Sequence, residues 1–312
     1  MLRGAIVGFG NVAQFGHWPA YQDNPDAKIV SVVDSSAERR AVAKQLSLQT
    51  CEAIDELRDL GIDFVDICTP PSHHAAQIGQ CIRNGWHVLC EKPFVTTSAQ
   101  LSEIPAPVGV AIVPVHNWKY APIIRRATDL LRSGTIGNLQ RAEIFVLRTQ
   151  AAASSGHSWR GDPAMAGGGI VMDHGWHAIY LALNWFGTSP LDVKAKLVKR
   201  TADQIESEAT LILGFASGSA TISLSWNAAS RDNRMNLIGD GGALAIEDDV
   251  LRVNGREEQF EEKLSAGSHH ADWFSAMLPD VLAAFRDPPR AQPMFDEAVE
   301  CLRIIEQTYA SA

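Results

Sequence analysis

The segment Gly8–Ala13, which reads Gly-Phe-Gly-Asn-Val-Ala, constrains the fold of this chain more than any other. It lies between a short apolar run that begins at Arg3 and a predicted helix, so it forms the turn of a strand–turn–helix unit. In such a turn Gly8 permits the tight bend, and Gly10 lets a pyrophosphate approach the backbone. Ala13 is small enough for the helix to pack closely on the strand. The segment therefore predicts a dinucleotide-binding βαβ unit.

A carboxylate at the end of the next apolar run supports dinucleotide binding. The run covers residues 28–33, and Asp34 follows it, 21 positions after the end of the glycine segment. Near that offset a carboxylate accepts hydrogen bonds from the adenine ribose hydroxyls and repels a 2′-phosphate. We therefore predict NAD rather than NADP, with the phosphates held at the helix start near Asn11 and Val12. The alternative is a structural turn in which Asp34 only caps the helix that begins near Ser36.

Composition excludes several classes of protein. A hydrophobic share of 46% over 312 residues is enough for a large core, and a formal charge of −9 disfavours nucleic acid and anionic membranes as partners. No stretch reaches the roughly 18 consecutive apolar residues of a membrane span, and the chain begins with a strand pattern rather than a signal peptide. We therefore expect a cytoplasmic protein. The five cysteines show no C-x-x-C spacing, so we predict neither a metal site nor a disulfide.

Strand and helix patterns alternate through the first third of the chain, which is typical of a parallel sheet with right-handed crossovers. Farther on, consecutive strands joined by short turns indicate an open, mostly antiparallel sheet, at residues 192–199, 208–215, 219–226 and 234–238. We predict an α/β protein whose residues 1–119 form a doubly wound, NAD-binding Rossmann domain. Residues 120–312 would form an α/β domain for substrate binding and oligomerisation, and its last helix could pack back on the first domain.

Apolar residues alternate along the strands of the second predicted domain. They are Leu211, Leu213 and Phe215 in one strand and Ile222, Leu224 and Trp226 in the next. One face of this sheet should pack on helices. The other could pack on a second subunit, because a large bare apolar patch is unusual on a monomer. We therefore predict a homodimer or homotetramer.

Ligands of a doubly wound sheet bind beyond the carboxyl ends of its strands, and three features of this sequence fall there. They are Thr69-Pro70, Glu91-Lys92-Pro93 and Asn117. Lys92 follows an apolar strand at the rim where a nicotinamide would lie, and its ammonium group can hydrogen-bond a substrate oxygen or exchange a proton with it. Glu91 could orient that ammonium group. The alternative is a solvated surface lysine.

A second constellation lies on a predicted helix at residues 170–186. Asp173 and His177 are four positions apart and share a face of that helix. A histidine held by a carboxylate can act as a base at neutral pH, and the glycines at 167–169 would let the chain and a ligand approach the helix start. The same spacing also fits a surface ion pair or an Asp/His metal pair, although no third ligand has a suggestive position.

In order along the chain, these segments resemble the Gfo/Idh/MocA family of oxidoreductases, which includes glucose–fructose oxidoreductase and inositol dehydrogenase. The matching segments are GFGNVA, the strand-end Asp34, TPPSHH, CEKP, HNWKYAP, WRGDPAMAGGG and the DHGWH helix. The resemblance implies a Rossmann domain followed by an α/β domain with a large open sheet. Together with the motifs above, it predicts contacts to NAD from Gly8, Gly10, Asn11, Val12, Asp34, Thr69, Pro70, His74, Glu91, Lys92 and Asn117.

The resemblance also implies the catalytic residues. Lys92 and His177 would be the proton-transfer residues, with Asp173 beside them. The peptide bond before Pro93 would be cis, which would aim Lys92. The family often has Asp three residues after the helix histidine, whereas this chain has Tyr180. That difference puts some substrate contacts of the family in question here.

The predicted function is an NAD-dependent dehydrogenase that transfers a hydride between nicotinamide and a secondary alcohol of a sugar, cyclitol or sugar derivative. His177 would take the hydroxyl proton, and Lys92 would stabilise the alkoxide. Two alternatives remain open: an NAD-dependent glycoside hydrolase that uses transient oxidation, and a non-catalytic dinucleotide-binding regulator. The sequence does not name the substrate, whose contacts we expect from residues 154–160 and near Trp118.

Overall fold

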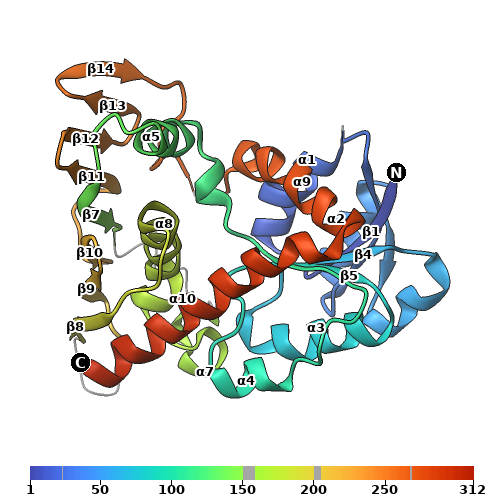
Figure 1. The fold of residues 1–312 in the computed structure, drawn as a ribbon. Helices are drawn as coiled ribbons and strands as arrows, with labels where there is room; N and C mark the ends of the chain where they lie inside the picture. The colour runs from blue at the N-terminus through green and yellow to red at the C-terminus, as the bar shows by residue number, and fades with distance from the viewer. Residues whose placement is uncertain (23, 150–158, 200–204, 268) are drawn as a thin grey trace. The chain divides into compact units, whose positions relative to one another are not determined.

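The chain divides into two compact units (Figure 1). The computed structural model describes residues 1–22, 24–149, 159–199, 205–267 and 269–312. Unit 1 comprises Met1–Asn117 and Ser268–Ala298, and unit 2 comprises Trp118–Gly267 and Val299–Ala312. Each unit therefore draws on two separate stretches of sequence. The assignment of NAD binding to residues 1–119 and of substrate binding to 120–312 remains a prediction.

Unit 1 is built on a parallel sheet of six strands in the order β3-β2-β1-β4-β5-β6. The strands are β1 Leu2–Val7, β2 Ala27–Val33, β3 Gln49–Cys51, β4 Phe64–Ile67, β5 His87–Cys90 and β6 Ile112–Pro114. The central strand β1 pairs in parallel with β2 on one side and β4 on the other. This is the strand order of a doubly wound dinucleotide-binding fold, so the predicted N-terminal architecture is confirmed.

Local sequence signals explain where the helices of unit 1 begin and end. α2 (Ala37–Gln45) begins after Ser36, whose hydroxyl accepts a hydrogen bond from the Arg39 N–H. Gly85 follows α3 (His74–Arg83) with a φ of 73°, which glycine adopts without strain. α9, which comes late in the sequence, packs on η1 and α1. The remaining helical segments are η1 Ala13–His17, α1 Trp18–Gln22, η2 Ile54–Leu60, η3 Pro71–His73, α4 Ser98–Glu103, α9 Ala271–Arg286 and η7 Pro288–Ala291.

Unit 2 contains an eight-stranded sheet in the order β14-β13-β12-β11-β7-β10-β9-β8 (Figure 1). The strands are β7 Leu139–Leu147, β8 Asp192–Val198, β9 Glu208–Phe215, β10 Gly218–Ser225, β11 Asp232–Gly239, β12 Gly242–Glu247, β13 Val250–Val253 and β14 Arg256–Gln259. Among the described strand pairs of this sheet only β7–β10 is parallel, so the predicted large, mostly antiparallel sheet is confirmed.

Helices of unit 2 pack on this sheet: α8 packs against β7 and β10, and α5 packs against β13. The helical segments are η4 Asn117–Tyr120, α5 Pro122–Arg132, η5 Trp159–Gly161, α7 Pro163–Ala166, η6 Val171–Gly175, α8 Trp176–Phe186 and α10 Gln292–Ser311. α10 contributes its first residues to unit 1 and its last residues to unit 2. In the described parts of the chain, no helix has both the length and the apolar character that a membrane crossing requires.

One face of the eight-stranded sheet is apolar and buried. Leu211 lies opposite Ile222 and Leu213 lies opposite Ala220, so the alternating apolar residues of β9 and β10 share this face. On the opposite face of these two strands, Ile212 is the one large apolar side chain, and it is 43% exposed. The alternation therefore builds the core of unit 2 rather than a second apolar surface. The homo-oligomer remains a prediction that these two strands do not support.

Candidate functional site

The glycine segment forms the turn between β1 and η1. Gly8 has a φ of 87°, and a Cβ at this position would lie 2.8–2.9 Å from atoms of Cys68 and Thr69. Both the backbone conformation and the crowding therefore require glycine here. This local geometry is the one that the sequence motif predicts.

The backbone at the second glycine is uncrowded. A Cβ on Gly10 would meet only the guanidinium of Arg39, whose Nη1 would be 3.3 Å away. At the start of the helix, Asn11 is exposed and Val12 is half-buried. Because no backbone crowds this side of the turn, a diphosphate could approach it as the motif requires.

Asp34 follows β2, and both of its carboxylate oxygens accept hydrogen bonds. Oδ2 accepts a hydrogen bond from the Phe9 N–H over 2.7 Å, and Oδ1 accepts one from the Ser36 N–H over 2.8 Å. Nη1 of Arg39 lies 3.7 Å from Oδ2. Since a carboxylate has about four lone-pair sites, acceptor sites remain for the ribose hydroxyls. Asp34 thus holds the glycine turn in place through Phe9 and contacts the start of the next helix through Ser36. The second contact is the capping role that the alternative interpretation assigns to it.

We expect NAD to bind more tightly than NADP, because a 2′-phosphate would lie against the Asp34 carboxylate. Asp34→Asn removes the charge but keeps an oxygen that can accept the Phe9 N–H. This variant should narrow the preference by roughly tenfold, since it also leaves the Arg39 guanidinium without its acidic neighbour. Calorimetric titration of both dinucleotides measures the effect. Equal or tighter NADP binding to the unmodified protein would contradict the prediction.

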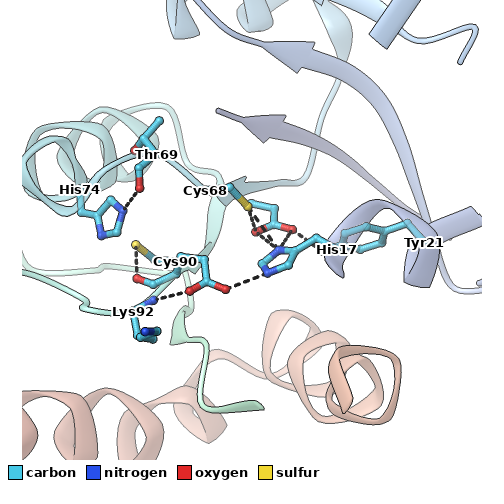
Figure 2. Close-up of polar contacts among 9 residues, drawn as sticks. His17, Tyr21, Cys68, Thr69, His74, Cys90 and Lys92 are labelled. Atoms are coloured by element: carbon cyan, nitrogen blue, oxygen red, sulfur yellow. Dashed lines mark hydrogen bonds and ion pairs between the residues drawn. The ribbon is translucent and has the colours of Figure 1, made fainter. Parts of the chain in front are cut away.

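His74 ties together two turns at the carboxyl ends of β4 and β5, and Figure 2 shows its contact with Thr69. Its Nε2 lies 2.9 Å from Thr69 O, and its Nδ1 lies 2.9 Å from Pro93 O. Burial lowers the pKa of His74, although carbonyl oxygens on both sides of the ring favour its charged form. His74 is fully buried, and Thr69 and Pro70 are half-buried. Contacts from these three residues to the cofactor remain predictions.

Lys92 lies at the carboxyl end of β5, half-buried, and the peptide bond that joins it to Pro93 is cis, as the resemblance implies. The Lys92 N–H donates to Glu91 Oε2 over 2.9 Å. Burial alone would raise the pKa of Glu91, but hydrogen bonding and charge from His17 and the charge of Lys92 lower it, so the carboxylate is ionised. A half-buried lysine beside a buried carboxylate differs from a solvated surface lysine.

The second constellation begins in a π-helical segment. η6 carries Asp173, whose Oδ2 lies 3.3 Å from His174 Nδ1, and α8 carries His177. The buried His177 has its Nδ1 2.8 Å from the Tyr180 hydroxyl. The Trp118 ring stacks on the His177 ring with centroids 4.6 Å apart. The backbone N–H of Trp118 donates to the Tyr180 hydroxyl over 3.1 Å. Tyr180 therefore orients His177 from the position where the family often has Asp.

The glycines before this helix serve packing. A Cβ on Gly169 would clash with Glu206, and one on Gly168 would clash with the Tyr309 hydroxyl. The buried Glu206 carboxylate accepts hydrogen bonds from the N–H groups of Gly169 and Val171, over 3.0 and 3.1 Å, and from the Tyr309 hydroxyl over 2.8 Å. The chain therefore approaches this helix start closely, as expected, and its Glu206 side chain binds two of the N–H groups there. The approach of a ligand remains a prediction.

Arg148, which follows β7, is a buried charge that belongs to none of the sequence motifs. It is 2% exposed, and its Nη1 donates to Leu147 O over 2.8 Å and to Asn233 Oδ1 over 3.1 Å. Its Cζ lies 6.0 Å from the Trp118 ring centroid. Burial and the neighbouring Arg231 lower the pKa of Arg148 to about 10, so it remains a cation at neutral pH. An arginine at the end of an apolar strand is the signal that identifies such a residue.

Asn117 is half-buried at the start of η4. Of the segment 154–160, which we expect to contact the substrate, residues 154–158 lie outside the described residues. The described residues therefore bring Glu91 and Lys92 together in unit 1, and His177 with Tyr180 in unit 2. The catalytic and cofactor-binding roles of these residues remain predictions.

Two family models match most of the chain. The model described as the oxidoreductase family with an NAD-binding Rossmann fold matches residues 2–107. The model described as the GFO/IDH/MocA C-terminal domain matches residues 124–245. The two matches follow the division into a parallel and a mostly antiparallel sheet.

The chain is also similar to individual proteins. It is 25% identical to D-apiose dehydrogenase of Paraburkholderia graminis over 100% of this chain and 88% of that protein. It is 28% identical to inositol 2-dehydrogenase of Rhizobium meliloti over 79% of this chain and 76% of that protein. Three other relatives, named only as oxidoreductases, are matched over just 54–61% of their own length.

Solved structures have the same fold. The crystal structure of GenD2 from gentamicin A biosynthesis, in complex with NAD, matches with a TM-score of 0.86 and 23% identity. The match covers 100% of this chain and 94% of that one. By fold and by sequence, the chain therefore belongs to the Gfo/Idh/MocA family of oxidoreductases and carries its NAD-binding Rossmann domain.

Proposed function

We propose that this protein is an NAD-dependent dehydrogenase acting on a secondary alcohol of a sugar, a cyclitol or a sugar derivative. The Lys92 turn carries the proposal. A half-buried lysine lies at the carboxyl end of β5, and its backbone N–H donates a hydrogen bond to the buried, ionised Glu91 side chain. The names of the relatives, D-apiose dehydrogenase and inositol 2-dehydrogenase, support polyhydroxylated alcohols as the substrate class.

The residues of the glycine turn fit NAD. Gly8 and Gly10 keep side chains out of the turn, and Asp34 retains acceptor sites for ribose hydroxyls. When bound, NAD supplies the group that accepts a hydride from the substrate carbon. The protein must then handle the proton and the charge on the substrate oxygen.

In the proposed reaction, Lys92 donates a hydrogen bond to the substrate oxygen and stabilises the negative charge that develops there. His177 takes the hydroxyl proton at Nε2. This requires Nδ1 to carry the other ring proton and to donate it to the Tyr180 hydroxyl, 2.8 Å away. The Trp118 backbone N–H donates to the same hydroxyl, and a hydroxyl oxygen has two acceptor lone pairs. In this proposal Asp173 stabilises the imidazolium that forms.

A screen of sugars and cyclitols with NAD tests the proposal. We expect at least one polyol to produce NADH in a one-to-one ratio with the oxidised product, followed by absorbance. A glycoside hydrolase would instead release a sugar from a glycoside with no net NADH. Binding of NAD without turnover of any compound would favour the non-catalytic regulator and contradict the dehydrogenase.

We also propose a cytoplasmic homodimer or homotetramer whose partner is its small-molecule substrate. The formal charge of −9 supports the expectation that neither nucleic acid nor an anionic membrane surface is a partner. We expect NAD rather than NADP as the cofactor, and no bound metal ion.

A further inference from the structure

A chain of buried polar side chains runs through unit 1 and ends at the Lys92 turn (Figure 2). Asp66 Oδ2 accepts from the Tyr21 hydroxyl over 3.1 Å and lies 2.9 Å from His17 Nδ1. His17 Nε2 lies 3.0 Å from Glu91 Oε1, and Glu91 Oε2 accepts the Lys92 N–H over 2.9 Å. His17 is 2% exposed and Asp66 is fully buried. One imidazole thus bridges two buried carboxylates.

The bridging position requires His17 to carry a proton on both ring nitrogens. An ionised carboxylate only accepts hydrogen bonds, so each ring nitrogen that faces one must donate. Burial alone would lower the pKa of His17, but the charge and the hydrogen bond of Asp66 raise it well above its usual value. Burial would raise the pKa of Glu91, but its hydrogen bond with His17 and the charge of His17 lower it. The imidazolium lies between two buried carboxylates, so each of the three charged groups has an oppositely charged partner, which lowers the free-energy cost of its burial.

Every described element around His17 contributes a defined neighbour. β4 provides Asp66, and Cys68 follows it with Sγ 3.3 Å from His17 Nδ1. Burial raises the pKa of the Cys68 thiol, which therefore stays protonated. Tyr21 comes from α1, and Phe274 of α9 stacks on the imidazole with ring centroids 3.8 Å apart. His17, Asp66 and Cys68 also offer metal-ligand atoms within 4.8 Å of one another, but their mutual hydrogen bonds already account for this arrangement.

The position of His17 in the sequence gives the bridge its significance. His17 ends η1, and the start of η1 is the glycine turn that would hold the dinucleotide phosphates. Glu91 and Lys92 follow β5, two strands away from β1 in the sheet. The Asp66–His17–Glu91 bridge therefore connects the dinucleotide-binding helix to the lysine turn.

We propose that His17 is a positioning residue: as an imidazolium it anchors Glu91 to Asp66 and so fixes the Lys92 turn relative to the dinucleotide-binding helix. Only its consequence for turnover rests on the proposed function, in which Lys92 contacts the substrate. The bridge itself can be tested without any substrate.

The first test observes His17 in the unmodified protein. Nitrogen NMR of ¹⁵N-labelled histidine at about pH 8 should show both His17 ring nitrogens protonated, above the ordinary titration range of the side chain. His87 provides an internal control, because burial lowers its pKa and its Nδ1 accepts the Ala111 N–H over 2.9 Å. His87 should be neutral at the same pH. A neutral His17 would overturn the proposal even if no variant folds.

The second test measures the turn itself through amide hydrogen exchange. In His17→Leu, Glu91 loses its anchor, and the Lys92 amide should exchange roughly tenfold or more faster. His17→Gln keeps a donor that can reach Glu91 and should restore part of the protection. His87→Gln, at the start of β5, should leave it unchanged. Equal Lys92 exchange in His17→Leu and the unmodified protein would show that the bridge does not hold the turn.

Turnover then separates this proposal from the proposed function. With a polyol found in the screen, His17→Leu should lower kcat by roughly tenfold or more and leave NAD affinity within a few-fold. Faster Lys92 amide exchange with an unchanged kcat would support the anchoring role of His17 and contradict the catalytic role of Lys92. Unchanged Lys92 amide exchange together with a lowered kcat would overturn the anchoring role of His17 and leave the catalytic role of Lys92 in place.

Discussion

Lys92→Met is expected to lower kcat by about 10²–10⁴-fold, the usual effect of removing a group that exchanges a proton with the reacting oxygen or stabilises its charge. Methionine keeps the length of the side chain and removes the ammonium group. The Lys92 N–H to Glu91 hydrogen bond belongs to the backbone, so the turn should persist in this variant. NAD affinity should therefore stay within a few-fold of its original value.

Lys44→Met is a matched control, because Lys44 is an exposed lysine of α2 in the same unit. It should leave both kcat and NAD affinity unchanged. Steady-state kinetics on a polyol found in the screen and calorimetry with NAD measure the two quantities separately. Near-normal turnover of Lys92→Met would refute the catalytic role, and a loss of NAD binding would reassign Lys92 to the cofactor or to the structure.

His177→Ala should have an effect of the same size, about 10²–10⁴-fold on kcat, because it removes the proposed base. Tyr180→Phe tests how that base is oriented. It removes the hydroxyl 2.8 Å from Nδ1 while keeping the ring, and we expect a smaller loss, roughly tenfold. His73→Ala, an exposed histidine of η3, is the control and should retain full activity. A larger loss in Tyr180→Phe than in His177→Ala would contradict the assigned roles.

A double variant tests whether Lys92 and His177 serve one reaction. If both act on the same substrate oxygen, the combined change should cost much less than the product of the two single losses. Fully multiplicative losses would indicate that the two groups act in separate steps.

The elements of unit 1 were largely predictable because their signals are local. The Ser36 cap marks the start of α2, and Gly85 marks the end of α3. Of the described strands, β3, β12, β13 and β14 escaped prediction. β3 has only three residues, and all four residues of β14, Arg256–Gln259, are exposed, so neither shows an apolar alternation. β12 does alternate, with Leu244 and Ile246 buried, and its pattern was missed.

The candidate site was predictable where topology determines position. Lys92 could be located because carboxyl ends of parallel strands form the binding edge of such sheets. The bridge of His17, Asp66 and Glu91 could not, because its members are 49 and 74 positions apart and each alone reads as an ordinary core or strand residue. Likewise, no local spacing indicates that Glu206 binds N–H groups 35 and 37 positions away.

The packing of α9 on η1 and α1 has a consequence for synthesis on the ribosome. About 150 residues, Trp118–Gly267, are translated between the last strand of the parallel sheet and α9. At 5–20 residues per second this interval lasts roughly 8–30 s. During it the ring of His17 lacks Phe274, and Phe64 lacks Phe285, whose ring centroid is 5.2 Å away in the finished protein. The nascent Rossmann sheet therefore waits with apolar surface uncovered, and a fragment that stops at Asn117 would keep that surface permanently exposed.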